Sequence, residues 1–331
     1  MPTSPAAPDV TGAARAPFAF VEPRACGASL DRADHLRQDP AALTELWSHA
    51  RVVLLDVDGR ALADDAGRLA TPDGRTLSGG PGGIGAAVFL GLDAGGQGWF
   101  ALDASLAAFD APQRIDLRAA AAACTTLEAA AFAQARALQH WRQRHRFCGA
   151  CGGEVALTRA GWLGRCARCG LEHYPRTDPA VIVAVGHGER LLLGRQANWP
   201  ARRWSVLAGF VEPGESLEQA VAREVLEETG IRVASCRYLA SQPWPFPGAL
   251  MLGFIAEAVD DAADPQVTGE LEDARWFDLE ALRAAEAREA TIGREEDDGG
   301  PLLSSPISIA RWLIREWLAQ RGCNGAPSAD R

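Results

Sequence analysis

The sequence predicts a mixed α+β protein built from more than one domain. Three observations lead to this expectation. The chain has 331 residues, short apolar runs alternate with turn-forming segments along most of it, and four of its eight cysteines form two closely spaced pairs. A chain of this length can form two or three domains with a sizeable core. Its hydrophobic content of 47% and charged content of 23% are those of a globular protein.

The first part of the chain carries strand and helix signals but no catalytic constellation. Residues 1–17 are rich in Pro, Ala and Thr, which predicts a disordered N-terminus. Residues 18–146 are expected to form a smaller mixed α/β domain, in which apolar runs at 51–56 and 86–92 predict strands. Residues 117–146 are dense in alanine and contain no Gly or Pro, so we expect one or two helices there.

Two Cys-x-x-Cys pairs predict a zinc ribbon in residues 147–175. Cys148 and Cys151 form the first pair, and Cys166 and Cys169 form the second. Each pair offers two thiolates from a tight turn, so the two pairs can complete a tetrahedral site of four cysteines. Because four thiolates leave no coordination position open, the expected zinc is structural, with one ion per chain. The alternative is a pair of redox disulfides, which a cytosolic setting disfavours.

The remaining segment, residues 176–322, alternates strand and helix signals and forms the expected catalytic domain. Residues 306–321 predict an amphipathic closing helix with Ile309, Leu313 and Trp317 on one face. Residues 323–331 predict a frayed tail. Strands are expected in six apolar runs, at 180–185, 190–194, 204–210, 232–240, 250–259 and 274–277.

Three carboxylates fall within one turn of a predicted helix between the third and fourth of these strands. Glu224, Glu227 and Glu228 stand at i, i+3 and i+4, so they lie within about 100° of helix arc. Like charges at this spacing repel one another unless a cation lies between them, and carboxylate oxygens suit Mg²⁺ or Mn²⁺. The alternative is a solvated acidic face. That face would lie opposite the apolar stripe beginning at Leu217, whereas Glu224 and Glu228 extend the stripe.

The whole segment from Gly209 to Ile231, GFVEPGESLEQAVAREVLEETGI, resembles the Nudix box, the signature of the Nudix hydrolases, at every defining position. The resemblance implies an α-β-α sandwich and hydrolysis of a diphosphate linkage joined to a nucleoside. It also implies that the three glutamates hold catalytic Mg²⁺ or Mn²⁺ and that Arg223 orients them by charge-assisted hydrogen bonds. Divalent ions would neutralise the diphosphate oxygens and lower the pKa of bound water. One of the glutamates would accept the proton of that water, and the sequence leaves open which one does.

A proline-rich aromatic motif beyond the box narrows the substrate. Residues 241–247 are SQPWPFP, and their prolines reduce the entropy lost when the loop orders. Trp244 and Phe246 would then be preset stacking surfaces for a base, the alternative being an ordinary structural loop. Together with the zinc ribbon, this motif is similar to that of the NADH pyrophosphatase family of Nudix hydrolases. The family pattern ends in a serine where this chain has Ala249.

The resemblance is dense from about residue 147 to 321 and thin before it, where it implies a Nudix-like first domain. It assigns further residues one by one. Tyr174 matches an aromatic on the nicotinamide side, Phe210 matches a residue that stacks on the base, and Ala310 matches a backbone contact on the last helix. Core packing is the alternative for these three. Gln242 belongs to the substrate-binding motif, and Glu270, within an acidic stretch, matches a downstream acid near the metals.

We therefore expect a metal-dependent enzyme that hydrolyses the diphosphate bond of NADH, and less readily NAD⁺, to NMN(H) and AMP. The resemblance also implies a homodimer. One alternative is removal of the NAD cap from RNA 5′ ends by the same site, since seven arginines lie between residues 142 and 176. Another is a Nudix-fold nucleotide-sensing regulator, but such a protein typically loses box glutamates and none is missing here.

Charge and hydropathy exclude other classes. A net charge of −10 argues against a general nucleic-acid binder held by phosphate contacts. No run of 18 or more apolar residues is present, so we expect no membrane-spanning helix. The first residues contain no apolar stretch typical of a signal peptide, and the expected location is cytoplasmic.

Overall fold

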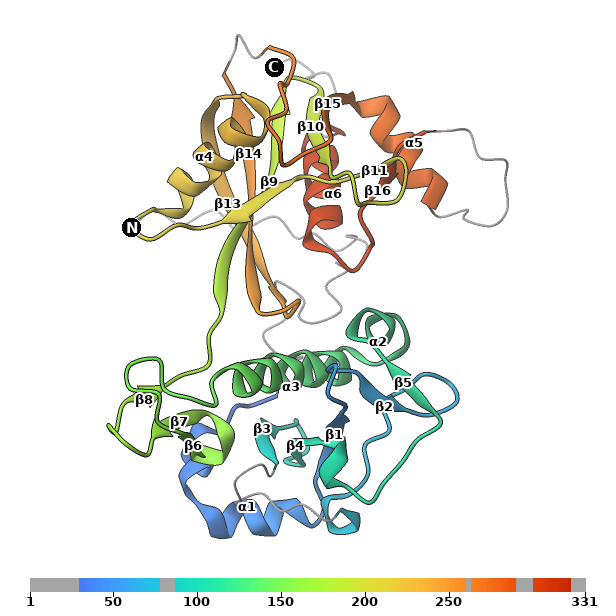
Figure 1. Cartoon of the computed structure of the whole chain (residues 1–331). Coiled ribbons are helices and arrows are strands. Elements are labelled where there is room, and N and C mark those ends of the chain that lie inside the picture. The colour runs from blue at the N-terminus through green and yellow to red at the C-terminus, as the bar shows by residue number, and fades with distance from the viewer. Residues whose placement is uncertain (1–29, 78–86, 260–262, 290–299, 323–331) are drawn as a thin grey trace, which may run out of the picture.

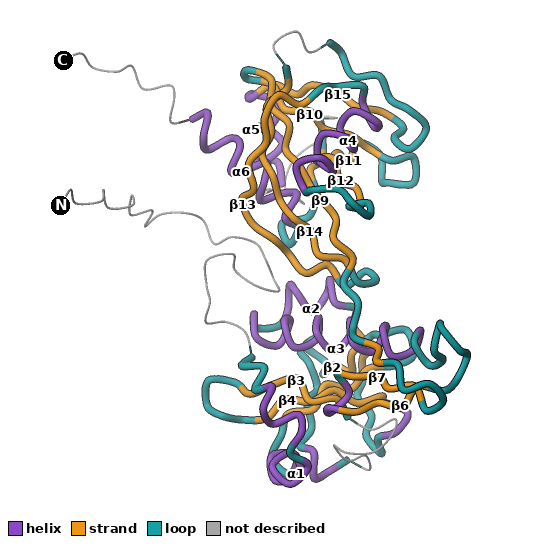
Figure 2. Tube along the Cα trace, turned by 90° about the vertical axis from the view of Figure 1, so that its left-hand side faces the viewer, coloured by secondary structure: helices purple, strands orange, loops and turns teal. Residues whose placement is uncertain are grey.

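Figures 1 and 2 show the chain, a computed structural model, as two α/β bodies joined through a small three-stranded module. The expectations for residues 1–17 and 323–331 lie outside the described residues. Among the helices described, none combines the length and the apolar character needed to cross a membrane. The structure describes residues 30–77, 87–259, 263–289 and 300–322.

The first domain is a five-stranded sheet with helices on both faces, in the order β3-β4-β1-β2-β5. On β1, Val53 and Leu55 face α3 while Val52 and Leu54 face α1, which explains its continuous apolar run. Thr125 caps α3 through a capping box with Glu128, so the alanine-dense segment forms two helices. The elements are α1 (Pro40–Trp47), β1 (Arg51–Leu55), β2 (Ala61–Ala63), β3 (Val88–Leu92), β4 (Gly98–Asp103), β5 (Gln113–Ile115), α2 (Leu117–Ala123) and α3 (Thr126–Arg144).

The ribbon is an antiparallel sheet of β6 (Val155–Thr158), β7 (Leu163–Cys166) and β8 (Glu172–His173). Three side-chain contacts attach the ribbon to the first domain. The indole N–H of Trp162 donates to the carbonyl of Phe89 at 2.7 Å. The Arg37 guanidinium lies 3.8 Å from the centre of the Trp162 ring. Arg159 and Asp34 also form an ion pair at 2.9 Å.

The second α/β body is a sandwich around a six-stranded mixed sheet, in which β13-β14-β9-β10-β15 are consecutive neighbours and β12 pairs with β9. β9 and β14 are parallel, and the other pairs in this sheet are antiparallel. The helix α4 packs on one face and α5 and α6 on the other. The strands are β9 (Asp178–His187), β10 (Arg190–Arg195), β12 (Leu207–Phe210), β13 (Val233–Trp244), β14 (Ala249–Ala258) and β15 (Asp273–Asp278), and the helices are α4 (Leu217–Thr229), α5 (Leu279–Glu289) and α6 (Ile309–Gly322).

Several elements differ from the sequence expectation. α1 and α5 were not predicted, and residues 241–244, expected in a loop, form the end of β13. The single strand expected at 204–210 is broken, because Ser205 exchanges both backbone hydrogen bonds with Gly194. The residues before the break form β11 (Arg203–Trp204), which pairs in parallel with β16 (Leu302–Leu303). The closing helix begins at Ile309 instead of residue 306, because the side-chain oxygen of Gln242 accepts the hydrogen bond of the Ile309 N–H at 2.8 Å.

Candidate active site

The box segment folds as strand, loop and helix, and each boundary has a local cause. Ser216 caps α4 by accepting from the N–H of Gln219, whose carboxamide accepts in turn from the N–H of Ser216. Gly230 ends the helix in the left-handed conformation, with φ of 70°. Gly209 lies directly beneath Glu224, where any Cβ would collide with the carboxylate. Glycine at this position therefore lets the acid lie against the strand.

Arg223 holds the acidic residues of the box in place. Its Nη1 donates to Oε1 of Glu224 at 2.9 Å and to Oε2 of Glu227 at 3.0 Å. Nε and Nη2 form a two-pronged pair with Glu215, at 2.6 and 2.9 Å, and Nη2 also donates to the carbonyl of Phe210. Hydrogen bonding from Arg223 lowers the pKa of the Glu215 carboxyl to about 2. A single guanidinium thus joins the loop, the strand and the helix.

Glu228 is the buried acid of the cluster. Its residue is 5% exposed, and its Oε2 has no hydrogen-bond partner in the described part of the chain. Burial, followed by the charges of Glu224 and Glu270, raises the pKa of Glu228 to about 8. Burial also raises the pKa of Glu224, with Glu227 and Glu270 adding to the effect. The charge of Glu270 therefore acts on Glu224 and Glu228, while its role as a metal ligand stays a prediction.

The donor set fits a divalent cation. A buried carboxylate without a partner is costly, and a cation beside it removes that cost. The side chain of Glu227, by contrast, is 60% exposed. Glu224, Glu227 and Glu228 do not form a compact cage: within the described ranges, only the four ribbon cysteines bring three or more metal-ligand atoms within 4.8 Å of one another. Hard oxygen donors with room for phosphate oxygens and water suit Mg²⁺ or Mn²⁺.

A pocket of about 360 Å³, the catalytic pocket, opens beside Glu228. Gln242, Trp244 and Ala310 also line it, so β13 and α6 meet the box helix there. Gln242 is 1% exposed, and both ends of its amide are bound to backbone. Its Nε2 donates to the carbonyl of Ile307 at 2.8 Å and its Oε1 accepts from Ile309. Gln242 therefore fixes the start of α6, next to Ala310.

The four cysteines of the ribbon form a site that fits zinc. The Sγ atoms of Cys148 and Cys169 are 3.8 Å apart, and those of Cys151 and Cys166 are 3.4 Å apart. A tetrahedral ion with bonds of about 2.3 Å requires sulfur separations of about 3.8 Å. Four cysteine donors would leave a bound zinc no open position, so the ion would stabilise the fold and take no part in the chemistry.

Comparison with known proteins matches each part of the chain. A NUDIX domain model matches residues 175–295, an NADH pyrophosphatase zinc ribbon domain matches 143–174, and an NADH pyrophosphatase-like rudimentary NUDIX domain matches 48–141. A Mycobacterium tuberculosis protein named NAD-capped RNA hydrolase NudC is 40% identical over 294 residues, covering 87% of this chain and 92% of the relative. The chain belongs to the NADH pyrophosphatase (NudC) family of Nudix hydrolases.

Other relatives match a smaller part of the chain. A Stutzerimonas stutzeri protein that is also named NAD-capped RNA hydrolase NudC is 45% identical over 181 residues, covering 55% of this chain and 59% of the relative. Among solved structures, a NUDIX hydrolase from Nitrosomonas europaea is 26% identical with a TM-score of 0.41, covering 55% of this chain and 94% of that one.

Three aromatic residues that we expected to contact the substrate of this NudC-family hydrolase are not among the residues that line the catalytic pocket. Tyr174 is 56% exposed, and its hydroxyl donates to Glu172 at 2.5 Å. Phe210 is 60% exposed at the end of β12. Phe246 meets Trp244 at an edge-to-face angle, with ring centres 5.0 Å apart, and packs against the core of the first domain. Tyr174 and Phe210 are too exposed for the core-packing alternative.

Arg118, a residue that no sequence motif singled out, also lines the catalytic pocket. It comes from α2 of the first domain, and its guanidinium lies 4.1 Å from the ring centre of Phe246 and 5.8 Å from that of Trp244. Figure 1 shows the hairpin of β13 and β14 extending toward α2 and α3. This contact brings Arg118 of the first domain to the catalytic pocket. Nothing in the local sequence around Arg118 distinguishes it from a solvated helix residue.

Proposed function

We propose that this NudC-family hydrolase cleaves the diphosphate bond of NADH and NAD⁺ in the catalytic pocket, releasing NMN(H) and AMP. The observation that carries the proposal is the juxtaposition of Glu228 and Trp244 in the walls of one pocket. The first is a buried, unpaired carboxylate suited to a cation, and the second is an aromatic surface suited to a base. Family membership supports the same reaction class.

Different residues of this chain would hold the metal, fix the acids and shape the pocket. Bound Mg²⁺ or Mn²⁺ would neutralise the diphosphate and lower the pKa of water. Arg223 holds Glu224 and Glu227 at fixed positions, and Glu228 presents its oxygen to the pocket from a low-dielectric surrounding. Gln242 fixes the backbone at Ala310, so the opposite wall of the pocket is rigid. Ordered donors and acceptors of this kind need little rearrangement when the substrate reacts.

The direct test is a product assay. Purified protein is incubated with Mg²⁺ or Mn²⁺ and with NADH, NAD⁺, ADP-ribose, diadenosine polyphosphates or NAD-capped RNA, and the products are separated by chromatography. We expect NMNH and AMP from NADH in equal amounts. If NADH stays intact while another of these substrates is cleaved, the assignment of NADH is wrong.

A second candidate is removal of the NAD cap from RNA, which the names of the relatives favour. The chain also carries basic residues around the catalytic pocket, since both Arg118 and Arg203 line it. Phosphates beyond the cap would add counterion release to binding. Turnover of capped RNA should then fall more steeply with added salt than turnover of NADH, and equal salt dependence would argue against contacts to the RNA chain.

We also propose that the enzyme is a homodimer. Tyr174 and Phe210 are large aromatic residues left exposed in the single chain, as expected of surfaces that a second copy covers. Sedimentation of the zinc-loaded protein tests this point, and a monomer at micromolar concentration would contradict it.

Arg118→Ala should raise KM for NADH by about tenfold with a smaller change in kcat. A guanidinium at the mouth of the catalytic pocket can form a charge-assisted hydrogen bond to an anionic substrate, and its loss weakens binding of substrate and transition state alike. The matched control is Arg114→Ala, an exposed arginine outside the pocket that pairs with Asp110 at 2.7 Å. Steady-state kinetics on both variants decide the matter, since an unchanged KM in Arg118→Ala removes this residue from the site.

A further inference from the structure

A second pocket, the ribbon pocket, lies between the first domain and the zinc ribbon. It has a volume of about 490 Å³, within the range of small-molecule sites. None of its lining residues lines the catalytic pocket. β4 and the turn after it form one side, the C-terminal half of α3 forms another, and the ribbon strand β6 closes the third. It is therefore a separate cavity, made where two modules of the chain meet.

One part of the ribbon pocket is apolar. Leu55, Val88 and Leu102 line it but are only 1–2% exposed, so the apolar wall open to a ligand comes from the ribbon, where Val155 and Leu157 are half-buried. Phe147 is 57% exposed at the rim, so the cavity is open to solvent. A flat ring placed here would remove apolar surface from water without displacing a side chain.

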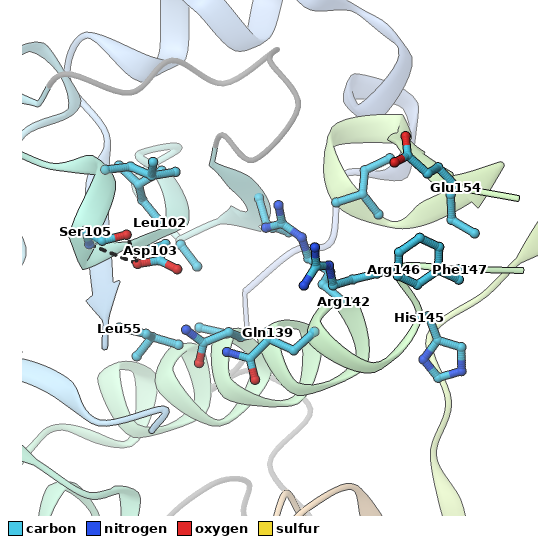
Figure 3. Close-up of a pocket in the computed structure, with 17 residues that line it drawn as sticks. Leu55, Leu102, Asp103, Ser105, Gln139, Arg142, His145, Arg146, Phe147 and Glu154 are labelled. Atoms are coloured by element: carbon cyan, nitrogen blue, oxygen red, sulfur yellow. Dashed lines mark hydrogen bonds between the residues drawn. The ribbon is translucent and has the colours of Figure 1, made fainter. Parts of the chain in front are cut away.

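The other part of the ribbon pocket carries charge. Arg142 and Arg146 lie between Asp103 on one side and Glu154 on the other (Figure 3). Asp103 is partly satisfied already, since its Oδ1 accepts from the hydroxyl of Ser105 at 2.7 Å and from its N–H at 2.9 Å. Burial lowers the pKa of Arg142, and the charge of Asp103 counteracts that effect. Two guanidinium groups beside an apolar wall suit a ligand with one anionic end.

The helix that lines the ribbon pocket lacks the carboxylates that would hold a metal on α4. Glu128 is the one acid in α3, and Arg51 and the capping residue Thr125 occupy its carboxylate. The C-terminal end of α3 instead carries arginines. Yet this part of the chain matches a rudimentary NUDIX domain. A phosphate bound here would be held by guanidinium groups directly, without the divalent ion that hydrolysis requires.

We propose that the ribbon pocket is a second ligand site that binds a nucleoside monophosphate. The base lies against Phe147, Val155 and Leu157 on the ribbon side, and the phosphate meets Arg142 and Arg146. Because Asp103 and Glu154 stand on opposite sides of the pocket and the described residues there form no cluster of three metal ligands, the site binds the nucleotide without cleaving it. The reaction proposed for the catalytic pocket releases molecules of this class, but the inference does not depend on that reaction.

The experiment is calorimetric titration of full-length, zinc-loaded protein with AMP, adenosine or inorganic phosphate, without added divalent metal. We expect AMP to bind at one site per chain and more tightly than either fragment. Arg142→Gln should weaken AMP at least about tenfold, because the charge-assisted contact is lost. Arg144→Gln, an exposed arginine on the same helix that does not line the cavity, should bind AMP as the wild type does.

Two further variants distinguish AMP bound in the ribbon pocket from AMP bound elsewhere on the chain. Leu157→Trp fills the ribbon pocket from the ribbon side and should also block AMP, with zinc content showing that the ribbon is folded. Trp244→Ala alters the catalytic pocket and should leave this AMP site unchanged. Absence of AMP binding, its loss in Trp244→Ala alone, or its retention in both Arg142→Gln and Leu157→Trp would overturn the proposal. Phosphate binding as tight as that of AMP would overturn the role of the apolar wall.

Discussion

Replacing Glu228 with glutamine should lower kcat for NADH by at least about a thousandfold and, at the same time, stabilise the metal-free protein at pH 8. The first effect follows from the loss of a metal-binding oxygen at the catalytic pocket, which contributes several kcal/mol to the transition state. The second follows from burial, because glutamine carries no charge into a site where a carboxylate has an oxygen without a partner.

The pH dependence of the second effect has a definite sign. In the unfolded chain Glu228 ionises near its usual pKa of 4.5, whereas in the fold its pKa is raised to about 8. Its contribution to the free energy of unfolding is therefore fully present below pH 4.5 and is lost as the pH rises to about 8. The loss is about 5 kcal/mol, because one pKa unit corresponds to about 1.4 kcal/mol, and the glutamine variant should not show it.

Calorimetric melting of metal-free protein across this pH window measures the effect on stability, and NADH kinetics with Mg²⁺ measure the effect on kcat. Added Mg²⁺ should stabilise the wild type at pH 8 and leave Glu228→Gln nearly unchanged, since binding to the folded state alone produces the shift. Glu218→Gln, on the exposed side of the same helix, is the matched control. A Glu228→Gln variant with the kcat of the wild type would remove Glu228 from the metal site.

Cys148→Ser should remove zinc from the chain and lower the melting temperature by about 10 °C or more. Structural zinc contributes folding free energy of many kcal/mol, and three thiolates do not replace four. The effect should reach the first domain, because the ribbon residue Trp162 donates to Phe89 and Arg159 pairs with Asp34. Zinc content by atomic spectroscopy and melting by calorimetry are the two measurements.

The control for this variant is Cys236→Ser, a half-buried cysteine on β13 outside the ribbon. It should keep one zinc per chain. Because the ribbon zinc has no open position for substrate, the kcat of folded Cys148→Ser should fall far less than that of Glu228→Gln. One zinc per chain and an unchanged melting temperature in Cys148→Ser would show that this cysteine is not a ligand.

Sequence reasoning succeeded where the cause of a structure is local. The helix of the box and the buried face of the closing helix were predicted from helical spacing, and the structure shows that the box helix is bounded by the nearby residues Ser216 and Gly230. The two cysteine pairs likewise carry their geometry in their spacing. Each of these features is fixed within a short stretch of chain, so the sequence displays it.

Features that depend on contacts between distant segments were not predictable. The break at Ser205 requires Gly194 on the neighbouring strand. Gln242 lies in a motif that suggests substrate contact, yet its amide is used by the backbone of α6, 65 and 67 residues further along the chain. Arg118 reaches the catalytic pocket only because two domains pack together. No local pattern encodes which remote surface a side chain will meet.

The loop after β13, residues 245–247, rests on the first domain, and this limits how far the chain can be shortened. Arg136 of α3 donates to the carbonyl of Pro245 at 3.0 Å, and Phe246 packs on the first domain. A fragment starting at the ribbon would keep every box glutamate but lose the surface on which the loop rests. The first domain, although it holds no box, thus acts as an internal support for the loop, and a fragment without it is expected to lose the position of Trp244 in the catalytic pocket.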